Sequence, residues 1–172
     1  MSADDLKTLL SVLAFGTSIV SIVLARSNWM QSNRPVLSAY IVECEMGEGV
    51  ALFNLSVANT GSRPATNVRV FFERGEFEKL IDPKVSQEAK MNLARCFGRD
   101  STIPLIRNGE TVTGGLGHAS RVASTEPQLT YGAEATAKIG YTDLEGKKYE
   151  STQPLKVFAR NGFTGWSWQD AA

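Results

Sequence analysis

Residues 50–73, VALFNLSVANTGSRPATNVRVFFE, contain two runs of alternating apolar and polar side chains separated by turn-forming residues. The period of two over residues 50–59 and 65–73 is typical of β-strands that bury one face, and both runs are rich in β-branched and aromatic residues. Between them Gly61 permits a positive φ, and Pro64 fixes its own φ. The stretch therefore predicts two strands joined by a turn that reverses the chain.

The same strand pattern continues on both sides of this stretch. The further runs cover residues 36–45, 102–106, 111–116, 133–142 and 147–158. The last two predict a hairpin closed by DLEG at residues 143–146, with Gly146 in the left-handed position of the loop. About seven strands in total predict a mainly β fold, an antiparallel two-sheet sandwich.

Residues 82–97, DPKVSQEAKMNLARCF, interrupt the strand pattern. Asp82 as a capping residue and Pro83 at the first helical position predict a short helix. An irregular crossover between the strands fits this segment equally well.

An apolar stretch precedes the sandwich. Residues 8–25, TLLSVLAFGTSIVSIVLA, carry no charge, and their only polar groups are Ser and Thr hydroxyls that can bond to backbone carbonyls one turn earlier. As a helix, residues 6–25 would span roughly 30 Å, which is the thickness of the hydrocarbon core of a bilayer. The stretch predicts a single-pass membrane anchor, and Trp29 just beyond it fits the interfacial position that aromatic side chains favour.

Two other readings of the apolar stretch stay open. A cleaved secretory signal normally begins with a basic leader, whereas the leader here is MSADDLK at residues 1–7. A helix packed against other subunits of an assembly has the same composition as a membrane span. The flanking charges favour the anchor over the signal.

Small residues recur along one face of the predicted helix at spacings of 3, 4, 3 and 4. They are Ser11, Ala14, Ser18, Ser21 and Ala25. Such a seam lets two membrane helices approach closely and predicts self-association. Chance tolerance of small residues is the alternative explanation.

The charges near the helix favour a cytoplasmic position for the domain that follows it. Arg26 and Arg34 lie after the helix, whereas Lys7 before it is accompanied by two aspartates, and positive charge favours the cytoplasmic side. Cysteine usage leaves the compartment open, because Cys44 and Cys96 are compatible with one disulfide or with two reduced thiols.

The sequence predicts four segments in the chain. They are an anchor helix at residues 1–26, a polar linker at 27–34, the sandwich at 35–160 and an aromatic C-terminal tail at 161–172. The balance of 18 basic and 18 acidic residues argues against nucleic-acid binding.

No pattern in the sequence predicts catalysis, a cofactor or a metal. The run GGLGH at residues 114–118 lacks the lysine and the strand-to-helix context of a phosphate-binding loop, so a flexible loop or a bulged strand is expected. His118, the only histidine, is predicted to lie in a solvent-exposed loop. No two Cys, His or Asp positions have the spacing of metal ligands. We therefore expect a protein that is not an enzyme.

The aromatic tail is the strongest candidate for a binding surface. Phe163, Trp166 and Trp168 occur within six residues, and such side chains dominate interface energetics. They predict binding of a protein partner or another subunit. A tail that folds back over the open end of the sandwich, or one that lies at the membrane surface, is the alternative.

Two motifs resemble those of immunoglobulin-like, adhesion-type β-sandwiches in bacterial proteins. They are LSVANTGSRPATNVRV at residues 55–70 and YTDLEGKKY at residues 141–149, and the resemblance covers about residues 36–158. It implies a presentation or interaction module with no common active site. The 82–97 insertion is long for such a sandwich, and the tail has no counterpart in it.

The leading functional interpretation is a membrane-anchored, non-catalytic interaction module that binds a protein partner or self-associates. One alternative is a structural subunit of an assembled particle, such as a virion or a secretion apparatus, whose apolar helix packs against protein. A second alternative is a small-molecule-sensing domain.

Overall fold

The structure is a computed structural model that describes residues 3–47, 49–98, 101–120, 122 and 125–158. The chain divides into two compact units, Met1–Arg34 and Pro35–Ala172. The boundary between the units falls at the residue where the sandwich is predicted to begin.

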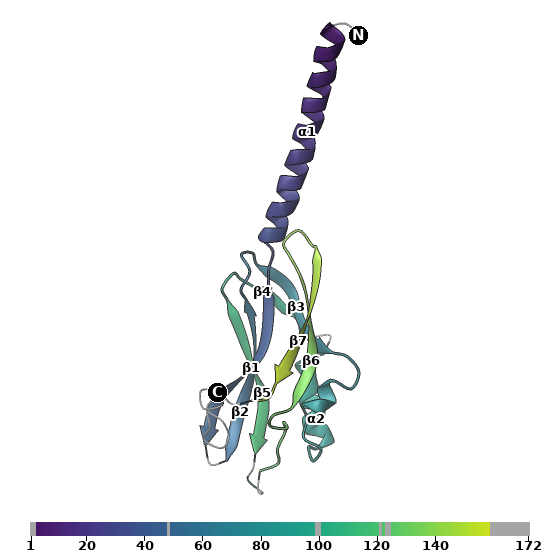
Figure 1. The fold of residues 1–172 in the computed structure, drawn as a ribbon. Coiled ribbons are helices and arrows are strands. Elements are labelled where there is room, and N and C mark those ends of the chain that lie inside the picture. The colour runs from purple at the N-terminus through teal and green to yellow at the C-terminus, as the bar shows by residue number, and fades with distance from the viewer. Residues whose placement is uncertain (1–2, 48, 99–100, 121, 123–124, 159–172) are drawn as a thin grey trace, which may run out of the picture. The chain divides into compact units, whose positions relative to one another are not determined.

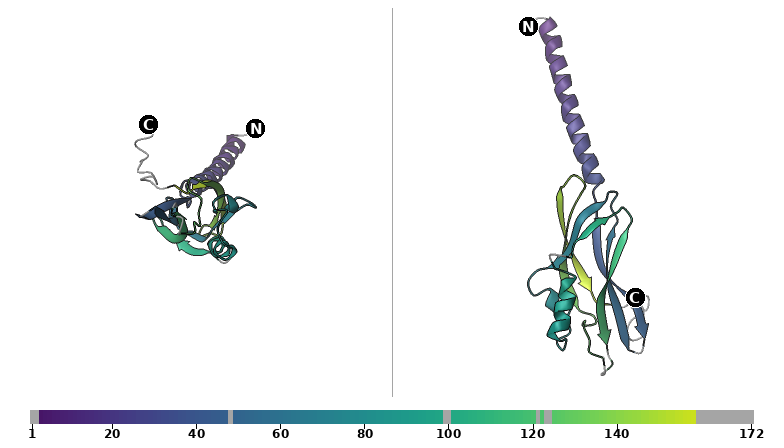
Figure 2. Two further views of the ribbon diagram at one scale, coloured as in Figure 1. Left: turned by 90° about the horizontal axis from the view of Figure 1, so that it is seen from below. Right: turned by 180° about the vertical axis from the view of Figure 1, so that it is seen from behind.

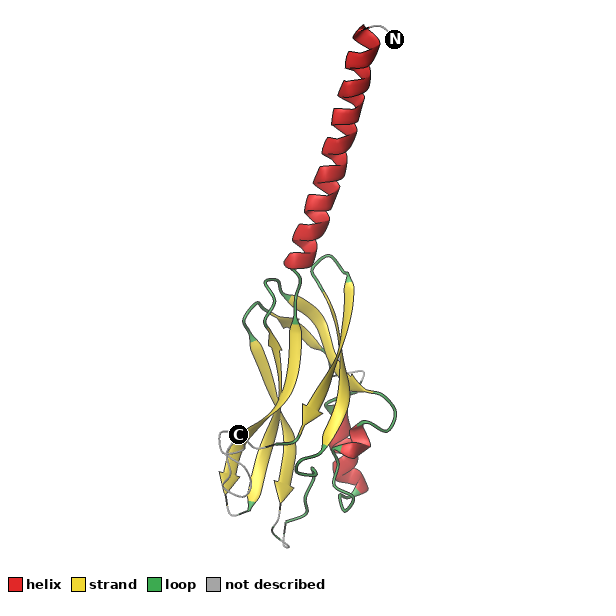
Figure 3. Cartoon of the chain, in the orientation of Figure 1, coloured by secondary structure: helices red, strands yellow, loops and turns green. Residues whose placement is uncertain are grey.

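The first unit contains α1 (Ala3–Ser32), one continuous helix of 30 residues (Figure 3). It extends through most of the predicted 27–34 linker, so residues 27–32 are helical. The linker contains no glycine or proline to stop the helix. The helix ends where Asn33 donates both its backbone N–H and its side-chain Nδ2–H to the carbonyl of Trp29, each at 2.9 Å, just before Pro35.

The second unit is an antiparallel two-sheet sandwich, as the sequence predicts (Figure 1). Sheet A has the order β1 (Leu37–Gly47), β2 (Val50–Asn59) and β5 (Thr111–Ser120). Sheet B has the order β4 (Ile103–Ile106), β3 (Ala65–Phe72), β6 (Glu134–Thr142) and β7 (Lys148–Lys156). The predicted range of β2 agrees with the structure residue for residue, because its apolar alternation is the clearest in the chain.

The core lies between the two sheets, whose strands surround a common interior in the view along them (Figure 2). One group of buried side chains centres on Leu37, Val68 and Ile139, and a second centres on Phe53 and Leu129. Side chains that contact both groups join them, and these are Ile41, Leu55, Phe72 and Phe97. The sandwich therefore has one continuous apolar core.

The connection between β3 and β4 contains a short 3-10 helix, η1 (Phe77–Lys79), and the helix α2 (Gln87–Arg95). The predicted start of the helix at Asp82 is wrong. The Asp82 carboxylate instead accepts a hydrogen bond from Lys84 N at 2.8 Å and forms a turn, and the Oγ of Ser86 caps α2 by accepting from Ala89 N. The capping residue Ser86 thus lies four residues after the predicted cap.

Three aromatic rings fix this connection to the sandwich. Phe72 at the end of β3 contacts Phe77 of η1 and Phe97 after α2, with ring centroids 5.7 Å and 4.7 Å away. Phe77 and Phe97 lie 5.4 Å apart. This cluster packs the insertion, which is longer than the sequence resemblance implies, against the core.

The glycine-rich run at residues 114–118 belongs to β5, which continues to Ser120 instead of ending at residue 116. The pairing of β2 with β5 shifts register between Phe53 and Asn54, so the run is a bulged strand. His118 is half-buried in this strand and its Nε2 lies 2.9 Å from the Glu126 carbonyl, so the prediction of a solvent-exposed loop histidine is wrong.

Gly117 is the glycine of this run that the packing requires. A Cβ atom at Gly117 would lie 3.1 Å from Leu93 of α2 and 3.0 Å from Gln128, whereas one at Gly114 would meet nothing within 4 Å. We expect Gly117→Ala to lower the free energy of unfolding by about 1–3 kcal/mol through overpacking. Gly114→Ala is the matched control and should change it by less than about 0.5 kcal/mol. Equal urea midpoints for the two variants would contradict this prediction, because they would show that α2 moves away from the added Cβ atom without loss of stability.

A left-handed backbone conformation occurs at one predicted residue and at one residue for which it was not predicted. Gly146 has φ 81° in the β6–β7 loop, as predicted. In the β2–β3 region the positive φ occurs at Asn67, with φ 51°, and not at Gly61. Asn67 lies where the pairing of β3 with β6 shifts register, so the bulge and not the turn requires this conformation.

Candidate functional site

Between Thr8 and Ala25 the surface of α1 carries no charged side chain on any side. The exposed large side chains include Leu9, Val12, Phe15, Val20 and Val23. Its hydroxyl groups are satisfied within the helix, because Ser11, Ser18 and Ser21 each donate to a carbonyl one turn earlier at 2.8–2.9 Å. By length and composition α1 is able to cross a membrane.

The predicted seam lies on one face of α1. With 100° between successive residues, the seam spans about 80° of the helix circumference. Its members are Ser11, Ala14, Ser18, Ser21 and Ala25, and all five are exposed. The face on the opposite side carries Val12, Gly16 and Val20.

The start of the sandwich is held by one buried amide. Asn59 is 1% exposed, and its Nδ2 donates to the carbonyls of Arg63 at 2.7 Å and Ile106 at 3.2 Å. Its Oδ1 accepts from the backbone N–H groups of Gly61 at 3.0 Å and Val36 at 3.3 Å. The side chain therefore joins the first residues of the domain to the β2–β3 turn and to the end of β4.

Tyr141 holds the same end of the sandwich from sheet B. Its buried hydroxyl donates to the carbonyl of Pro35 at 3.1 Å, and its ring stacks on Tyr149 at 5.4 Å. The first two residues of the second unit are thus bonded to both sheets, Pro35 to Tyr141 of sheet B and Val36 to Asn59 of sheet A. These contacts fix the backbone of Pro35 and Val36, the first residues of the sandwich unit.

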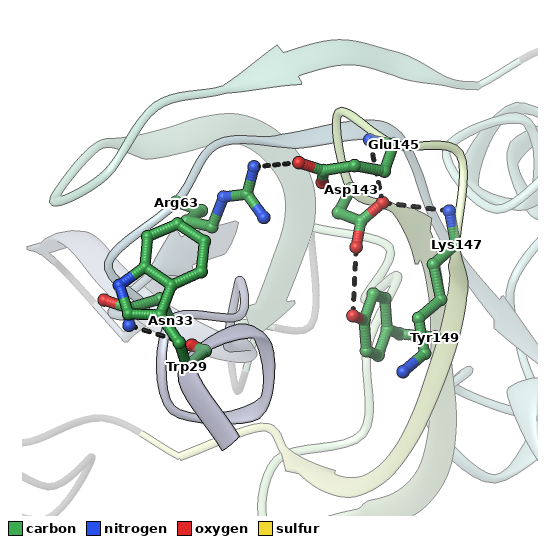
Figure 4. A network of polar contacts seen from close by, with 7 residues as sticks. All are labelled: Trp29, Asn33, Arg63, Asp143, Glu145, Lys147 and Tyr149. Atoms are coloured by element: carbon green, nitrogen blue, oxygen red, sulfur yellow. Dashed lines mark hydrogen bonds and ion pairs between the residues drawn. The ribbon is translucent and has the colours of Figure 1, made fainter. Parts of the chain in front are cut away.

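The β6–β7 turn contains a network of polar contacts (Figure 4). The buried carboxylate of Asp143 accepts from the backbone N–H groups of Glu145 at 3.0 Å and Lys147 at 2.9 Å, and from the hydroxyl of Tyr149 at 3.0 Å. Glu145 also pairs with Arg63, and this hydrogen bond raises the pKa of the guanidinium. Both carboxylates serve the structure of the turn.

The charged residues around Gly75 form ion pairs. Hydrogen bonds from Lys79 and from the backbone N–H of Thr136 lower the pKa of Glu76. Glu73 pairs with Lys138 at 2.7 Å, and hydrogen bonds to Glu73 and then Glu150 raise the pKa of this lysine.

A groove of about 980 Å³ follows the edges of the two sheets where β1 and β7 diverge. One wall is formed by residues 40–44 of β1, and the other by Pro154, Lys156 and Phe158 at the end of β7. The groove carries one carboxylate, Glu43, and one ammonium, Lys156, and otherwise mostly apolar and hydroxyl side chains. Sequence patterns do not reveal it, since its walls are more than 100 residues apart in the chain.

A smaller apolar cavity of about 300 Å³ opens between β4 and β5. It is lined mainly by core side chains, including Leu55, Val68 and Val112, with Cys96 at its rim. Cys96 and Cys44 are both exposed and are not joined by a disulfide. Within the described ranges no group of three His, Cys, Asp or Glu side chains is placed to hold a metal ion.

The predicted partner-binding residues Phe163, Trp166 and Trp168 lie outside the described residues, so their role stays a prediction. The last described residue before them is Phe158, whose ring stacks on Tyr131 with 5.7 Å between centroids. Phe158 also lines the groove.

The chain thus belongs to the class of proteins in which a long apolar helix precedes an antiparallel two-sheet sandwich. Residues 6–159, most of the chain, match the family described as domain of unknown function DUF8453, and the protein belongs to this family. The match includes both α1 and the sandwich and ends before the aromatic tail. No curated protein matches the sequence significantly.

Proposed function

We propose that this protein is a membrane-anchored, non-catalytic interaction module in which α1 holds the sandwich at a membrane. The observation that carries the proposal is the surface of α1 between Thr8 and Ala25, which has no charged side chain on any side and whose hydroxyls are bonded to helix carbonyls. A helix with this surface has no hydrophilic face to turn toward water. The hydrocarbon core of a bilayer accommodates such a helix, because its backbone groups are all bonded within the helix.

The position of the domain on the cytoplasmic side is part of the proposal. Lys7 is paired with Asp4 at 3.4 Å, which offsets the positive charge before the helix, whereas Arg26 and Arg34 follow it. This asymmetry supports a cytoplasmic sandwich. The seam of small residues supports self-association within the membrane.

The strand order supports the resemblance to immunoglobulin-like sandwiches. A sheet of the first, second and fifth strands faces a sheet of the fourth, third, sixth and seventh. Constant-type immunoglobulin domains differ from this order in the sheet to which the fourth strand belongs. Such sandwiches are scaffolds for many functions, so the order supports a binding module without naming its partner.

The membrane proposal predicts how the full-length chain behaves on fractionation. We expect it to stay in the membrane pellet after carbonate washing, to float with lipid in a density gradient, and to enter the detergent phase on phase partitioning. Release of the chain by carbonate would contradict the proposal. Sedimentation of detergent-free particles without lipid would favour the alternative of a structural subunit.

The side of the membrane is measured separately in sealed vesicles. For a cytoplasmic sandwich, added protease should digest the domain in inside-out vesicles and leave it intact in right-side-out vesicles. The reverse result would place the domain on the outside while leaving membrane attachment unaffected.

A further inference from the structure

One core-facing position of β5 has no side chain. In the pairing of β2 with β5, Gly114 lies opposite Leu55, whose side chain packs against the core. Residues directly opposite each other share one face of a sheet, so Gly114 faces the core as well. The residues two positions before and after it, Val112 and Leu116, both pack in the core. Gly114 therefore interrupts a row of apolar side chains on the inner face of sheet A.

Neighbouring residues do not fill the space that Gly114 leaves. A Cβ atom at this position would meet nothing within 4 Å, and the residue is exposed although it faces the core. The space belongs to the cavity of about 300 Å³ between β4 and β5. Gly117 in the same strand is different, because Leu93 of α2 would lie 3.1 Å from its Cβ atom. The glycine-rich run thus allows close packing at one position and opens the core at another.

Core side chains of both sheets form the walls of this cavity. Leu55 and Val57 of β2 belong to sheet A, and Val68, Val70 and Ile103 belong to sheet B. Val57 and Val68 are 2% and 0% exposed, so the cavity reaches the interior of the sandwich. Of the described residues that line it, none carries a charge. Such a lining favours an apolar molecule, because an ion would lose its hydration without gaining a partner.

The outer edge of β5 supplies polar groups at the cavity. Asn59 N of β2 donates to the Glu110 carbonyl at 3.0 Å, so alternate residues from 110 to 114 direct their backbone groups toward β2. Thr113 and Gly115 therefore direct theirs toward the open edge, and both residues line the cavity. Within the described ranges the Thr113 groups have no backbone partner on this side, and the Gly115 carbonyl lies 3.9 Å from the Cys96 thiol. One hydroxyl or amide group of a ligand can both donate to and accept from such an edge.

The volume of the cavity limits the size of the ligand. An apolar protein cavity of about 150 Å³ stays dry and binds benzene. Twice this volume holds a molecule of roughly twelve non-hydrogen atoms. A whole membrane lipid or a segment of another protein is too large to enter.

We propose that this cavity binds a small, uncharged, mainly aliphatic molecule of about a dozen non-hydrogen atoms that carries one hydroxyl or amide group. The apolar part fills the space opposite Leu55 that Gly114 leaves empty, and its burial supplies the affinity. The polar group bonds to the edge of β5 at Thr113 and Gly115 and orients the molecule.

This site goes beyond the proposed interaction module, because it gives the sandwich a small-molecule ligand of its own. It lies within the second unit of the chain and does not depend on whether α1 spans lipid. Because the ligand would contact β2, β3, β4 and β5 together, its binding should stabilise the packing of the two sheets.

Cys96 provides a direct test, because its exposed thiol lines the cavity. The test uses the full chain in detergent micelles with Cys44→Ser, so that maleimide labels Cys96 alone, and 1-decanol is the probe. Only the empty fraction of the sites should react, so labelling should be about five-fold slower when free decanol reaches four times its Kd. A labelling rate that does not change with decanol would overturn the proposal.

A variant that fills the cavity shows where the probe binds. Gly114→Leu places a side chain in the empty space, so its urea midpoint should rise and decanol should no longer slow the labelling of Cys96. Thr111→Leu adds the same side chain on the opposite face of β5 and is the matched control, which should keep the five-fold effect. If Gly114→Leu does not fold, Gly114→Val makes the same comparison with a smaller side chain. Equal slowing in the filled variant and the control would place the probe elsewhere and overturn the proposal.

Decanoate tests whether the site selects an uncharged molecule, because it has the same chain length as decanol and ends in a carboxylate. A carboxylate cannot donate to the backbone carbonyls of the β5 edge and finds no cation among the described residues that line the cavity. We expect the same slowing to require a free concentration of decanoate about ten-fold higher than that of decanol, with both measured by equilibrium dialysis. Equal protection at equal free concentrations would overturn the assignment of an uncharged ligand.

Discussion

Replacing Asn59 by alanine is expected to lower the free energy of unfolding of the sandwich by about 3 kcal/mol. The side chain is 1% exposed and takes part in four hydrogen bonds. Its removal leaves the carbonyls of Arg63 and Ile106 and the N–H groups of Val36 and Gly61 without this partner. Each buried group that loses its partner costs about 1–3 kcal/mol, reduced where water reaches it.

Urea unfolding of the full chain in detergent micelles, followed by the β-sheet circular dichroism signal, measures this effect. Asn92→Ala, at an exposed position of α2, is the matched control and should change the free energy of unfolding by less than about 0.5 kcal/mol. If Asn59→Ala behaves like Asn92→Ala, water replaces the amide and the buried network does not hold the domain together.

Asn59→Asp sharpens the same test, because it keeps the shape and replaces the amide donor by a carboxyl group. Facing the carbonyls of Arg63 and Ile106, the carboxylate would lack hydrogen bonds, so its folded-state pKa should be raised. The unfolded chain then binds fewer protons than the folded one above a pH of about 3.9. We therefore expect the stability of Asn59→Asp relative to the natural chain to fall as the pH rises above this value.

Local patterns were sufficient to predict the strands and several turns. The alternation in residues 50–59 gave β2 without error, and Gly146 has the left-handed conformation expected in its loop. The Ser and Thr hydroxyls of α1 bond to carbonyls of the preceding turn as predicted. In each of these cases the decisive interactions lie within a few residues of one another, so sequence periodicity records them.

The elements that were predicted wrongly depend on contacts with distant residues. The helix α2 begins after Ser86, whose N–H donates to the Glu126 carboxylate 40 residues away, and not at Asp82. The strand β5 continues through its glycines because it pairs with β2 along its length and because Gly117 lets α2 approach. A glycine-rich run looks irregular in the sequence, and only the packing shows why it is extended.

The groove could not be predicted from the sequence for the same reason. In the sequence Gln153 is an ordinary polar residue of a strand. In the structure its side chain bonds to the backbone of Ala39 and Leu37 in β1, which are 114 and 116 positions earlier in the chain. Pro154 was a signal that was available, since proline within a strand indicates an edge.

Two aspartates placed in the middle of α1 are expected to move the full-length chain from membranes into the carbonate supernatant. In Gly16→Asp with Val20→Asp both charges lie opposite the seam, and each costs about 2.5–3.5 kcal/mol at the centre of a membrane helix. The total of roughly 6 kcal/mol shifts the distribution between membrane and water by about 10⁴-fold. Flotation in a density gradient measures the fraction that stays with lipid.

Gly16→Leu with Val20→Leu is the matched control, and this variant should float with lipid like the natural chain. If the aspartate variant also floats, the helix does not contact the hydrocarbon through this face. That result would favour the alternative in which α1 packs against protein.

The seam separates lipid contact from helix contact within the same experiment. Ser18→Leu with Ser21→Leu fills the face of small residues without introducing charge, so membrane attachment should be unchanged while close approach of two helices is blocked. Cross-linking in native membranes should then show a loss of dimers for the seam variant and none for Gly16→Leu with Val20→Leu. If both leucine variants lose dimers equally, the chains associate without a preferred face, and the regular spacing of Ser11, Ala14, Ser18, Ser21 and Ala25 has no part in it. If only the seam variant does, one face of α1 meets a second helix while the opposite face meets lipid.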